Sequence, residues 1–215
     1  MTEHVWVSHL MGNEASIVAK VRGTFGPGGR AADGADTIEP GQPLPTGYGP
    51  IRLWDCDDSN EDQHSGYCVN IAQRVPDVFL GCGFRVISGR VADILQRFDL
   101  GKGAVLPISD GLYLSDESTR IPGSYYSWHV GTKKAAYDSE NSVNVRKEKI
   151  PGLWDMMPYF PADGDVAVSG VALEGPDVWL DDGLFKSLFL SGPLGGALEA
   201  AGLKESLFLY EARVV

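Results

Sequence analysis

One segment of this 215-residue chain occurs twice in similar form, and the repetition limits the folds that the chain can adopt. The first copy, PDVFLGCGFRVISGRVADILQRFDL, spans residues 76–100, and the second, PDVWLDDGLFKSLFLSGPLGGALEAAGL, spans 176–203. In each copy an apolar run leads into a Ser-Gly pair, after which apolar residues recur at the spacing of one helical face. Each copy therefore predicts a strand that passes directly into a short helix.

The boundaries of both helices are predicted by residue type. Serine is a favoured N-cap because its hydroxyl accepts a free backbone N–H of the first turn, so we expect helices to begin at Ser88 and Ser191. Pro193 suits the first turn, where its missing N–H is tolerated. Gly101 and Gly202 suit the left-handed turn that often closes a helix.

A second strand is expected after each helix, in the runs AVLPIS and SLFLYEARVV. Two copies are too few for a solenoid, which usually needs three or more stacked units. The sequence predicts an α+β fold with mixed, mainly antiparallel sheets, a few short helices and two pseudo-repeated strand-helix-strand units. Coincidental similarity between two ordinary strand-helix units is the alternative.

The region before the repeat has a different composition. Residues 3–22 are rich in β-branched residues and predict one or two strands. Residues 24–50 hold so many glycines and prolines that neither a helix nor a central strand can continue, which predicts a long exposed loop. We therefore expect an N-terminal strand and loop region, 1–66, packed on a main α+β domain, 67–215.

The charge balance narrows the possible partners. The chain has 18 Lys and Arg against 29 Asp and Glu, a net charge of −11. Such a surface repels phosphate backbones and anionic lipids, so we expect neither nucleic acid nor membrane as a partner. It would attract a basic protein, although acidity that only maintains solubility is an equally simple explanation.

Cysteine usage and the N-terminus predict a cytoplasmic protein. Cys56, Cys68 and Cys82 are odd in number and form no CxxC pair, so reduced thiols are expected. The N-terminal residues lack a basic head followed by an apolar run, and no segment approaches the ~18 apolar residues that would span a bilayer.

Catalytic motifs are missing from the sequence. There is no GxxxxGK[ST] loop, no GxGxxG and no GxSxG. His64 lies between Cys56 and Cys68 without the tight pairing of a zinc site, and His129 follows Trp128 in an apolar run typical of a core position. We therefore predict no metal, no cofactor, no catalytic residues and no enzymatic activity.

Acidic side chains supply the candidate partner-binding residues. A solvated or partner-facing loop is expected where five acids follow Trp54 in close succession: Asp55, Asp57, Asp58, Glu61 and Asp62. The second candidate is the pair Asp181 and Asp182, where the first copy of the repeat has Gly81 and Cys82. The second copy also contains the inserted residues LFKS, and we expect these differences between the copies to mark function.

The run from Tyr125 to Val215 resembles the immunity proteins of bacterial polymorphic-toxin systems, specifically their eleventh numbered class. The resemblance rests on YYSWHV with the later turn DSENS, on PDVWLDDGLFKSLFLS before the last helix, and on the closing AGLKESLFLYEARVV. Glu205 and Ser206 stand where a small residue is expected. The first 66 residues lie outside the similarity.

This resemblance implies a protein that binds and neutralises a cognate toxin and has no catalytic residues of its own. Toxins of such systems that act in the cytosol are often directed at nucleic acids and carry basic clefts, to which an acidic inhibitor is complementary. Two other classes are considered: a small hydrolase that uses paired carboxylates, and a structural or scaffold protein.

Overall fold

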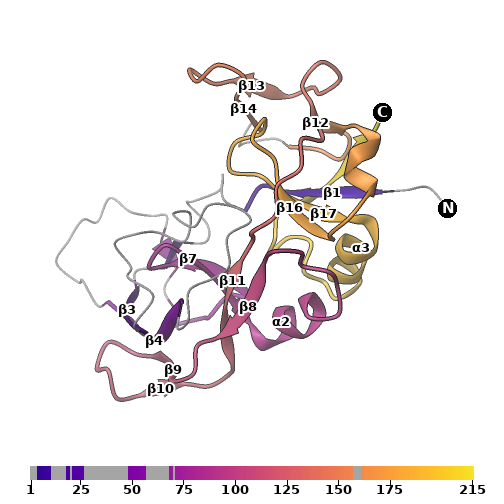
Figure 1. The fold of residues 1–215 in the computed structure, drawn as a ribbon. Helices are drawn as coiled ribbons and strands as arrows, with labels where there is room; N and C mark the ends of the chain where they lie inside the picture. The colour runs from indigo at the N-terminus through magenta and orange to yellow at the C-terminus, as the bar shows by residue number, and fades with distance from the viewer. Residues whose placement is uncertain are drawn as a thin grey trace. The chain divides into compact units, whose positions relative to one another are not determined.

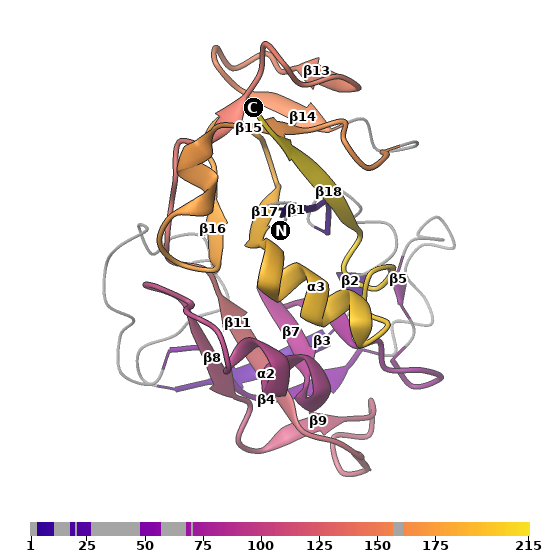
Figure 2. The ribbon, with the colours of Figure 1, turned by 90° about the vertical axis from the view of Figure 1, so that its right-hand side faces the viewer.

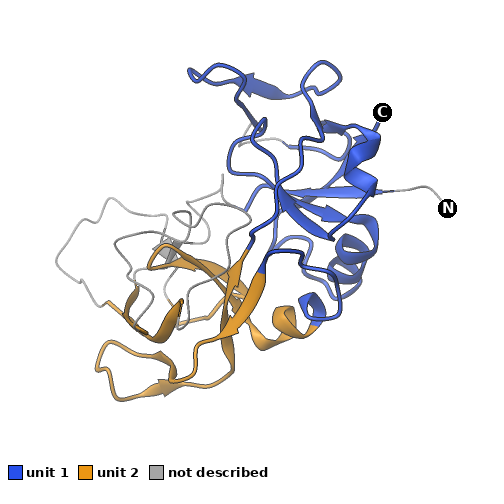
Figure 3. Cartoon of the chain, viewed as in Figure 1, with its two compact units in different colours: residues 1–13, 94–103, 130–215 blue, residues 14–93, 104–129 orange. Residues whose placement is uncertain are grey.

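The computed structural model describes residues 4–10, 18–19, 21–26, 48–56, 68–69, 71–156 and 161–215. Most of the expected loop at 24–50 lies outside the described residues. The chain divides into two compact units, coloured separately in Figure 3. Unit 1 comprises residues 1–13, 94–103 and 130–215, and unit 2 comprises residues 14–93 and 104–129. Because the units alternate along the chain, neither corresponds to the expected segments 1–66 and 67–215.

Unit 1 is built on a sheet whose central strand comes from the N-terminal part of the chain (Figure 1). In spatial order its strands are β12 (Tyr137–Asp138), β15 (Ala167–Val168), β18 (Leu209–Val214), β1 (Val5–Ser8), β17 (Leu188–Ser191) and β16 (Val178–Leu180). The helix α3 (Gly192–Ala200), the 3₁₀ helix η2 (Gly170–Leu173) and the hairpin β13 (Val145–Lys147) and β14 (Trp154–Met156) complete the unit.

Unit 2 contains two sheets. The first has the order β5 (Cys68–Val69), β2 (Val18–Ala19), β6 (Val78–Gly81), β7 (Phe84–Ser88), β11 (Tyr125–His129) and β8 (Ala104–Pro107). The second has the order β10 (Arg120–Ile121), β9 (Gly111–Tyr113), β4 (Pro50–Asp55) and β3 (Val21–Phe25). The helix α2 (Gly89–Leu95) follows β7 directly.

The predicted fold class is confirmed. Most strand pairs are antiparallel, and β15 with β18 and β4 with β9 are among the parallel exceptions. Helices are short, and among the described residues none has the length and apolar composition needed to cross a membrane. The chain is therefore a mixed-sheet α+β protein.

The two sequence copies adopt the same local topology. Each forms an antiparallel hairpin, β6–β7 or β16–β17, followed by a helix and then by a further strand, β8 or β18. In each sheet a strand from elsewhere in the chain lies between the second hairpin strand and the last strand: β11 lies between β7 and β8, and β1 lies between β17 and β18 (Figure 2).

The register of the inserted strands is also the same in both copies. Tyr125 in β11 pairs with Ser88, and Val5 in β1 pairs with Ser191. The similarity between the copies therefore extends from sequence to strand pairing. It makes β1 and β11 equivalent, although one lies before both copies in the sequence and the other lies between them.

The aspartate of the Pro-Asp-Val run that both copies share contributes to each predicted helix cap. The Ser88 hydroxyl donates to Asp77 at 2.6 Å, and the Ser191 hydroxyl donates to Asp177 at 2.5 Å. With its proton held by an aspartate, the Ser191 oxygen accepts the Leu194 N–H at 3.4 Å. The Ser88 oxygen accepts the Val91 N–H at 3.5 Å, so both predicted N-caps are confirmed, and each aspartate orients its serine hydroxyl toward the helix.

The predicted helix ends are confirmed for α3 and wrong for α2. After α3, Gly202 has φ +72°, its N–H donates to Glu199, and Leu203 donates to Leu198, which is the hydrogen-bond pattern that closes helices. The helix α2 ends at Leu95, and Gly101 occupies a later turn, where its N–H donates to the Asp99 side chain. The prediction from Gly101 therefore placed the end of α2 too late.

Each unit has its own apolar core. In unit 1, Trp179 and Phe189 are fully buried and their rings stack 5.7 Å apart. In unit 2, Leu53, Phe79 and Leu112 are fully buried in one core cluster to which both sheets contribute. Burying one such side chain stabilises the fold by about 1.5–3 kcal/mol. These cores fix the strands on which the candidate sites lie.

Candidate functional site

The first predicted site begins at the end of β4 in unit 2. Trp54 pairs across the sheet with Arg22 and with Tyr113, and both Trp54 and Asp55 are half-buried. The remaining candidates of this loop, Asp57, Asp58, Glu61 and Asp62, lie outside the described residues. The structure therefore places only the first two residues of this site.

The two acids of the second predicted site have different environments. Asp181 is 8% exposed, and its carboxylate accepts the backbone N–H groups of Ala136, Tyr137 and Gly183 at 2.6, 2.8 and 2.9 Å. The Asp182 side chain is 78% exposed and forms an ion pair with Lys133 at 2.6 Å. Asp181 thus holds the backbone together, and Asp182 is the acid that a partner could reach.

The loop at 181–187, between β16 and β17, is held in place on both sides. The Trp154 N–H donates to the carbonyl of Gly183 at 2.9 Å, and the Phe185 N–H donates to the carbonyl of Trp154 at 2.6 Å. The Phe185 side chain is nevertheless 41% exposed. Because the first copy has only a tight turn at Cys82 and Gly83, this loop and its exposed aromatic ring belong to the second copy alone.

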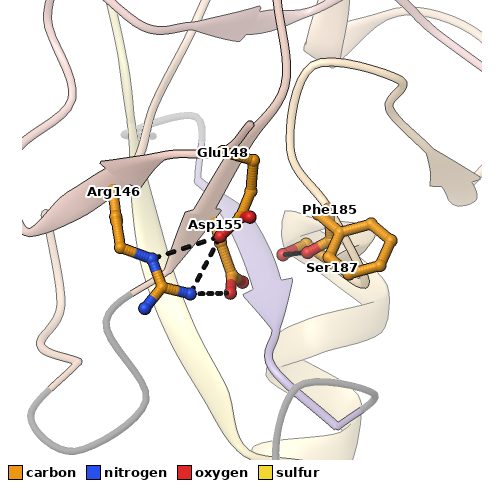
Figure 4. A network of polar contacts seen from close by, with 5 residues as sticks. All are labelled: Arg146, Glu148, Asp155, Phe185 and Ser187. Atoms are coloured by element: carbon orange, nitrogen blue, oxygen red, sulfur yellow. Dashed lines mark hydrogen bonds and ion pairs between the residues drawn. The ribbon is translucent and has the colours of Figure 1, made fainter. Parts of the chain in front are cut away.

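A charged cluster lies next to this loop on the β13–β14 hairpin (Figure 4). The Arg146 guanidinium contacts Glu148 at 2.8 Å and Asp155 at 3.3 Å, while the ring of Phe185 points away from the cluster. The Ser187 hydroxyl donates to the Phe185 carbonyl at 3.2 Å. Arg146 therefore links the two strands of the hairpin beside the loop.

A buried histidine in unit 1 was not singled out by the sequence. His9 is 2% exposed, and among the residues that the structure describes neither of its ring nitrogens finds a hydrogen-bond partner. Burial lowers the pKa of His9, the carboxylate of Asp155 opposes this shift, and the charge of Lys186 adds to it. A protonated imidazole would be costly in this environment, so His9 is stable as the neutral form.

A hollow of about 590 Å³ runs along α3 in unit 1, and we refer to it as the α3 groove. Its lining includes apolar, small and charged side chains: His4, Trp6, Leu173, Gly196, Glu199 and Glu211. These residues come from the start of β1, from η2, from α3 and from β18. No sequence pattern predicted this groove, because the start of β1 lies far along the chain from the other three segments that contribute to it.

The described residues contain no group of three or more His, Cys, Asp and Glu side chains able to hold a metal ion. No family model matches the chain, and a search of curated proteins also finds no match. The candidate features are therefore the half-buried start of the acidic loop in unit 2 and, in unit 1, the exposed loop 181–187 and the α3 groove.

Proposed function

We propose that this chain is an immunity protein that binds and neutralises a cognate bacterial toxin, one that acts in the cytosol on nucleic acids. The observation that carries the proposal is the loop 181–187. It presents an exposed aromatic side chain, Phe185, and an exposed acid, Asp182, on a backbone that is already fixed to β14. The resemblance of the C-terminal half to immunity proteins supports the same function.

A loop of this kind suits a protein interface. Interfaces are enriched in aromatic residues at their centre and are polar at their rim, and aromatic anchors often supply most of the binding energy. Binding orders side chains, at about 0.5–1.5 kcal/mol each, and it also orders mobile loops. A loop already held by hydrogen bonds avoids much of the loop-ordering cost. Phe185 is therefore the expected anchor and Asp182 the expected rim residue.

The net charge of −11 favours a basic partner. Complementary charge accelerates diffusional encounter and weakens with added salt, while buried contacts determine the dissociation rate. A nucleic-acid-directed toxin must attract phosphates and so carries positive charge near its active site. The acidic inhibitor and the basic toxin would then associate quickly, with the loop providing the lasting contact.

The proposal is tested by expressing the C-terminal toxin domain of the neighbouring gene with and without this chain, scoring growth and co-purification. Rescue of growth together with a stable complex is expected. In that complex, Phe185→Ala should weaken affinity by about tenfold or more, as expected for an interface anchor. Asp182→Lys should mainly slow association and reduce its salt dependence.

Ile51→Ala is the matched control, because Ile51 is 40% exposed and lies in unit 2. It should leave affinity unchanged. Growth rescue without any complex would contradict the proposed function. A complex whose affinity is the same for Phe185→Ala as for Ile51→Ala would show that the loop is not the contact.

A further inference from the structure

We infer that the α3 groove receives a basic side chain, arginine or lysine, that projects from the partner protein. This inference rests on the proposed function but concerns a different surface. The groove lies beside Ser191, where β17 ends, whereas the loop 181–187 lies before β17 begins. A partner could therefore contact both ends of the same strand.

The groove has room and an apolar floor. At Gly196 an added Cβ would meet no atom within 4 Å, so the space above this face of α3 is open. Trp6 contributes to the floor and Leu173, which is 40% exposed, to the wall. The volume of about 590 Å³ lies within the range of ligand-binding pockets. Apolar surface of this kind packs well against the methylene groups of arginine or lysine, whose charged heads stay near polar groups.

The charges of the groove favour a cation. The side chains of Glu199 and Glu211 are 46% and 43% exposed, and His4 lies 3.6 Å from Glu211. The N-terminus of α3 would favour an anion, but its dipole is equivalent to only about half a positive charge, against the full charge of Glu211 and the charge of Glu199 that Lys204 partly offsets. Ser191 already accepts one of the free N–H groups of that terminus. The carboxylates therefore dominate.

The chain contains an internal example of the proposed contact. The ammonium of Lys204 lies 5.0 Å from the centroid of the Trp6 ring and 3.4 Å from the carboxylate of Glu199. It also contacts Asp163 at 3.3 Å. An aromatic face next to a carboxylate is a favourable environment for a cation. Trp6 and Glu199 thus already stabilise one basic side chain, and Glu211 supplies a second carboxylate for another.

The other copy of the repeat has a different residue at this position. Counting from the equivalent caps Ser88 and Ser191, Asp93 of α2 corresponds to Gly196 of α3. A side chain at that position would project from the helix face that borders the groove. The glycine that leaves this face of α3 open is therefore found in the second copy and not in the first, as is the loop 181–187.

The first experiment needs no toxin. The full-length protein, labelled with ¹⁵N, is titrated with N-acetyl-arginine amide, and with N-acetyl-citrulline amide as the neutral isostere. The arginine probe should shift the amide signals of Gly192 and Gly196. Binding should be at least about tenfold weaker for citrulline, since its polar head carries no charge for the carboxylates. Equal shifts with both probes, or none with arginine, would overturn the inference.

Variants locate the binding. Gly196→Phe fills the groove, and the double change Glu199→Gln with Glu211→Gln removes its charge without adding bulk. Both should weaken arginine binding by about tenfold or more, whereas Glu205→Gln, an exposed acid outside the groove lining, should not change it. Arginine binding that persists in both groove variants would overturn the inference.

The second experiment uses the complex with the toxin domain. Gly196→Phe and the double glutamine variant should each weaken the complex by about tenfold or more, with Glu205→Gln unchanged. A complex of unchanged affinity in both groove variants would overturn the groove inference and leave the proposed function standing. Failure of the wild-type chain to bind the toxin at all would instead contradict the proposed function.

Discussion

The two copies of the repeat share their capping chemistry and differ in what they present to solvent. Asp77 with Ser88 and Asp177 with Ser191 form the same hydrogen-bonded cap, in the same register against an inserted strand. The repeated letters therefore encode architecture. The candidate binding surfaces of unit 1, the loop 181–187 and the α3 groove, occur only where the second copy departs from the first.

The hairpin turns show the first departure. In the first copy the turn residue Cys82 donates its thiol to the Val21 carbonyl, and burial raises its pKa to about 11. In the second copy the turn is lengthened, and the preceding position, Gly81 in the first copy, is Asp181. The added carboxylate holds the longer loop in place, so the extra residues are presented on a fixed backbone.

The helix faces show the second departure. The positions that correspond to Ala92 and Asp93 in α2 are Gly195 and Gly196 in α3. Gly195 lies against Trp6, where an added Cβ would be 2.0 Å from the indole ring, whereas Gly196 faces open space. One glycine therefore permits close packing of α3 on β1, and the other leaves the groove open.

Asp181→Gly, which restores the residue of the first copy, should have the largest effect. Three backbone N–H groups would lose a charged acceptor, and such hydrogen bonds contribute about 1.5–3 kcal/mol each, so the free energy of unfolding should fall by roughly 3 kcal/mol or more. Chemical denaturation measures this change. Asp181→Asn, which keeps one acceptor oxygen, should lose less than Asp181→Gly; an Asp181→Asn variant as stable as the unchanged chain would mean that the carboxylate charge does not matter.

Gly195→Ala introduces the residue type that the first copy has at the corresponding position, Ala92. It should destabilise the fold by about 1–3 kcal/mol, since the methyl group has no room beside the buried Trp6 ring. Gly196→Ala is its matched control. It should raise stability by up to about 1 kcal/mol, because alanine is the better helix former and the space is open. Thermal unfolding of both variants measures the difference, and similar values for the two glycines would refute the packing argument.

Ser88→Ala and Ser191→Ala should each lower the free energy of unfolding by about 1 kcal/mol, the usual loss for an N-cap serine. The expected equality follows from the matching contacts to Asp77 and Asp177. Denaturation curves of the two single variants provide the comparison. A large loss in one copy and none in the other would show that the caps are equivalent in geometry but not in energy.

The smallest effect should come from His9, which lies just after β1. Because burial lowers its folded-state pKa, the unfolded chain binds this proton more readily. The contribution of neutral His9 to the free energy of unfolding is therefore fully present above the unfolded-state pKa of about 6.5, and it is lost as the pH falls below that value. In His9→Gln the unfolding midpoint should fall less steeply between about pH 7.5 and about pH 5, the range on either side of the reference pKa of histidine. The same change at the exposed His4 serves as control, and an unaltered slope in His9→Gln would contradict the assignment.

Local chemistry made the helix starts predictable from the sequence. Serine before glycine, followed by apolar residues at helical spacing, specifies a cap whatever the surroundings. Gly101 shows the limit of the same reasoning, because α2 ends at Leu95 and the chain makes further turns before that glycine. A glycine marks a turn, but it does not say which turn closes the helix.

Long-range pairing could not be predicted. Nothing local in Val5–Ser8 indicates that this strand pairs with β17 and β18 and not with its neighbours in sequence. The role of Asp181 depends on the amides of Ala136 and Tyr137, which are distant in the chain, so an acid that looked available for a partner proved to be buried. The α3 groove was not predicted for the same reason, because separate segments line it. The inserted residues LFKS, in contrast, include Phe185 and did mark the exposed loop.

The central position of β1 also has a consequence for synthesis on the ribosome. The Ser8 hydroxyl donates to the carbonyl of Leu207, 199 residues further along the chain. At the usual elongation rate of about 5–20 residues per second, β1 must wait roughly 10–40 s for its partners to emerge. During that time an apolar strand with two unpaired edges is available to chaperones or to aggregation. Folding of this sheet therefore requires that β1 stay free of wrong partners until the last strands have been synthesised.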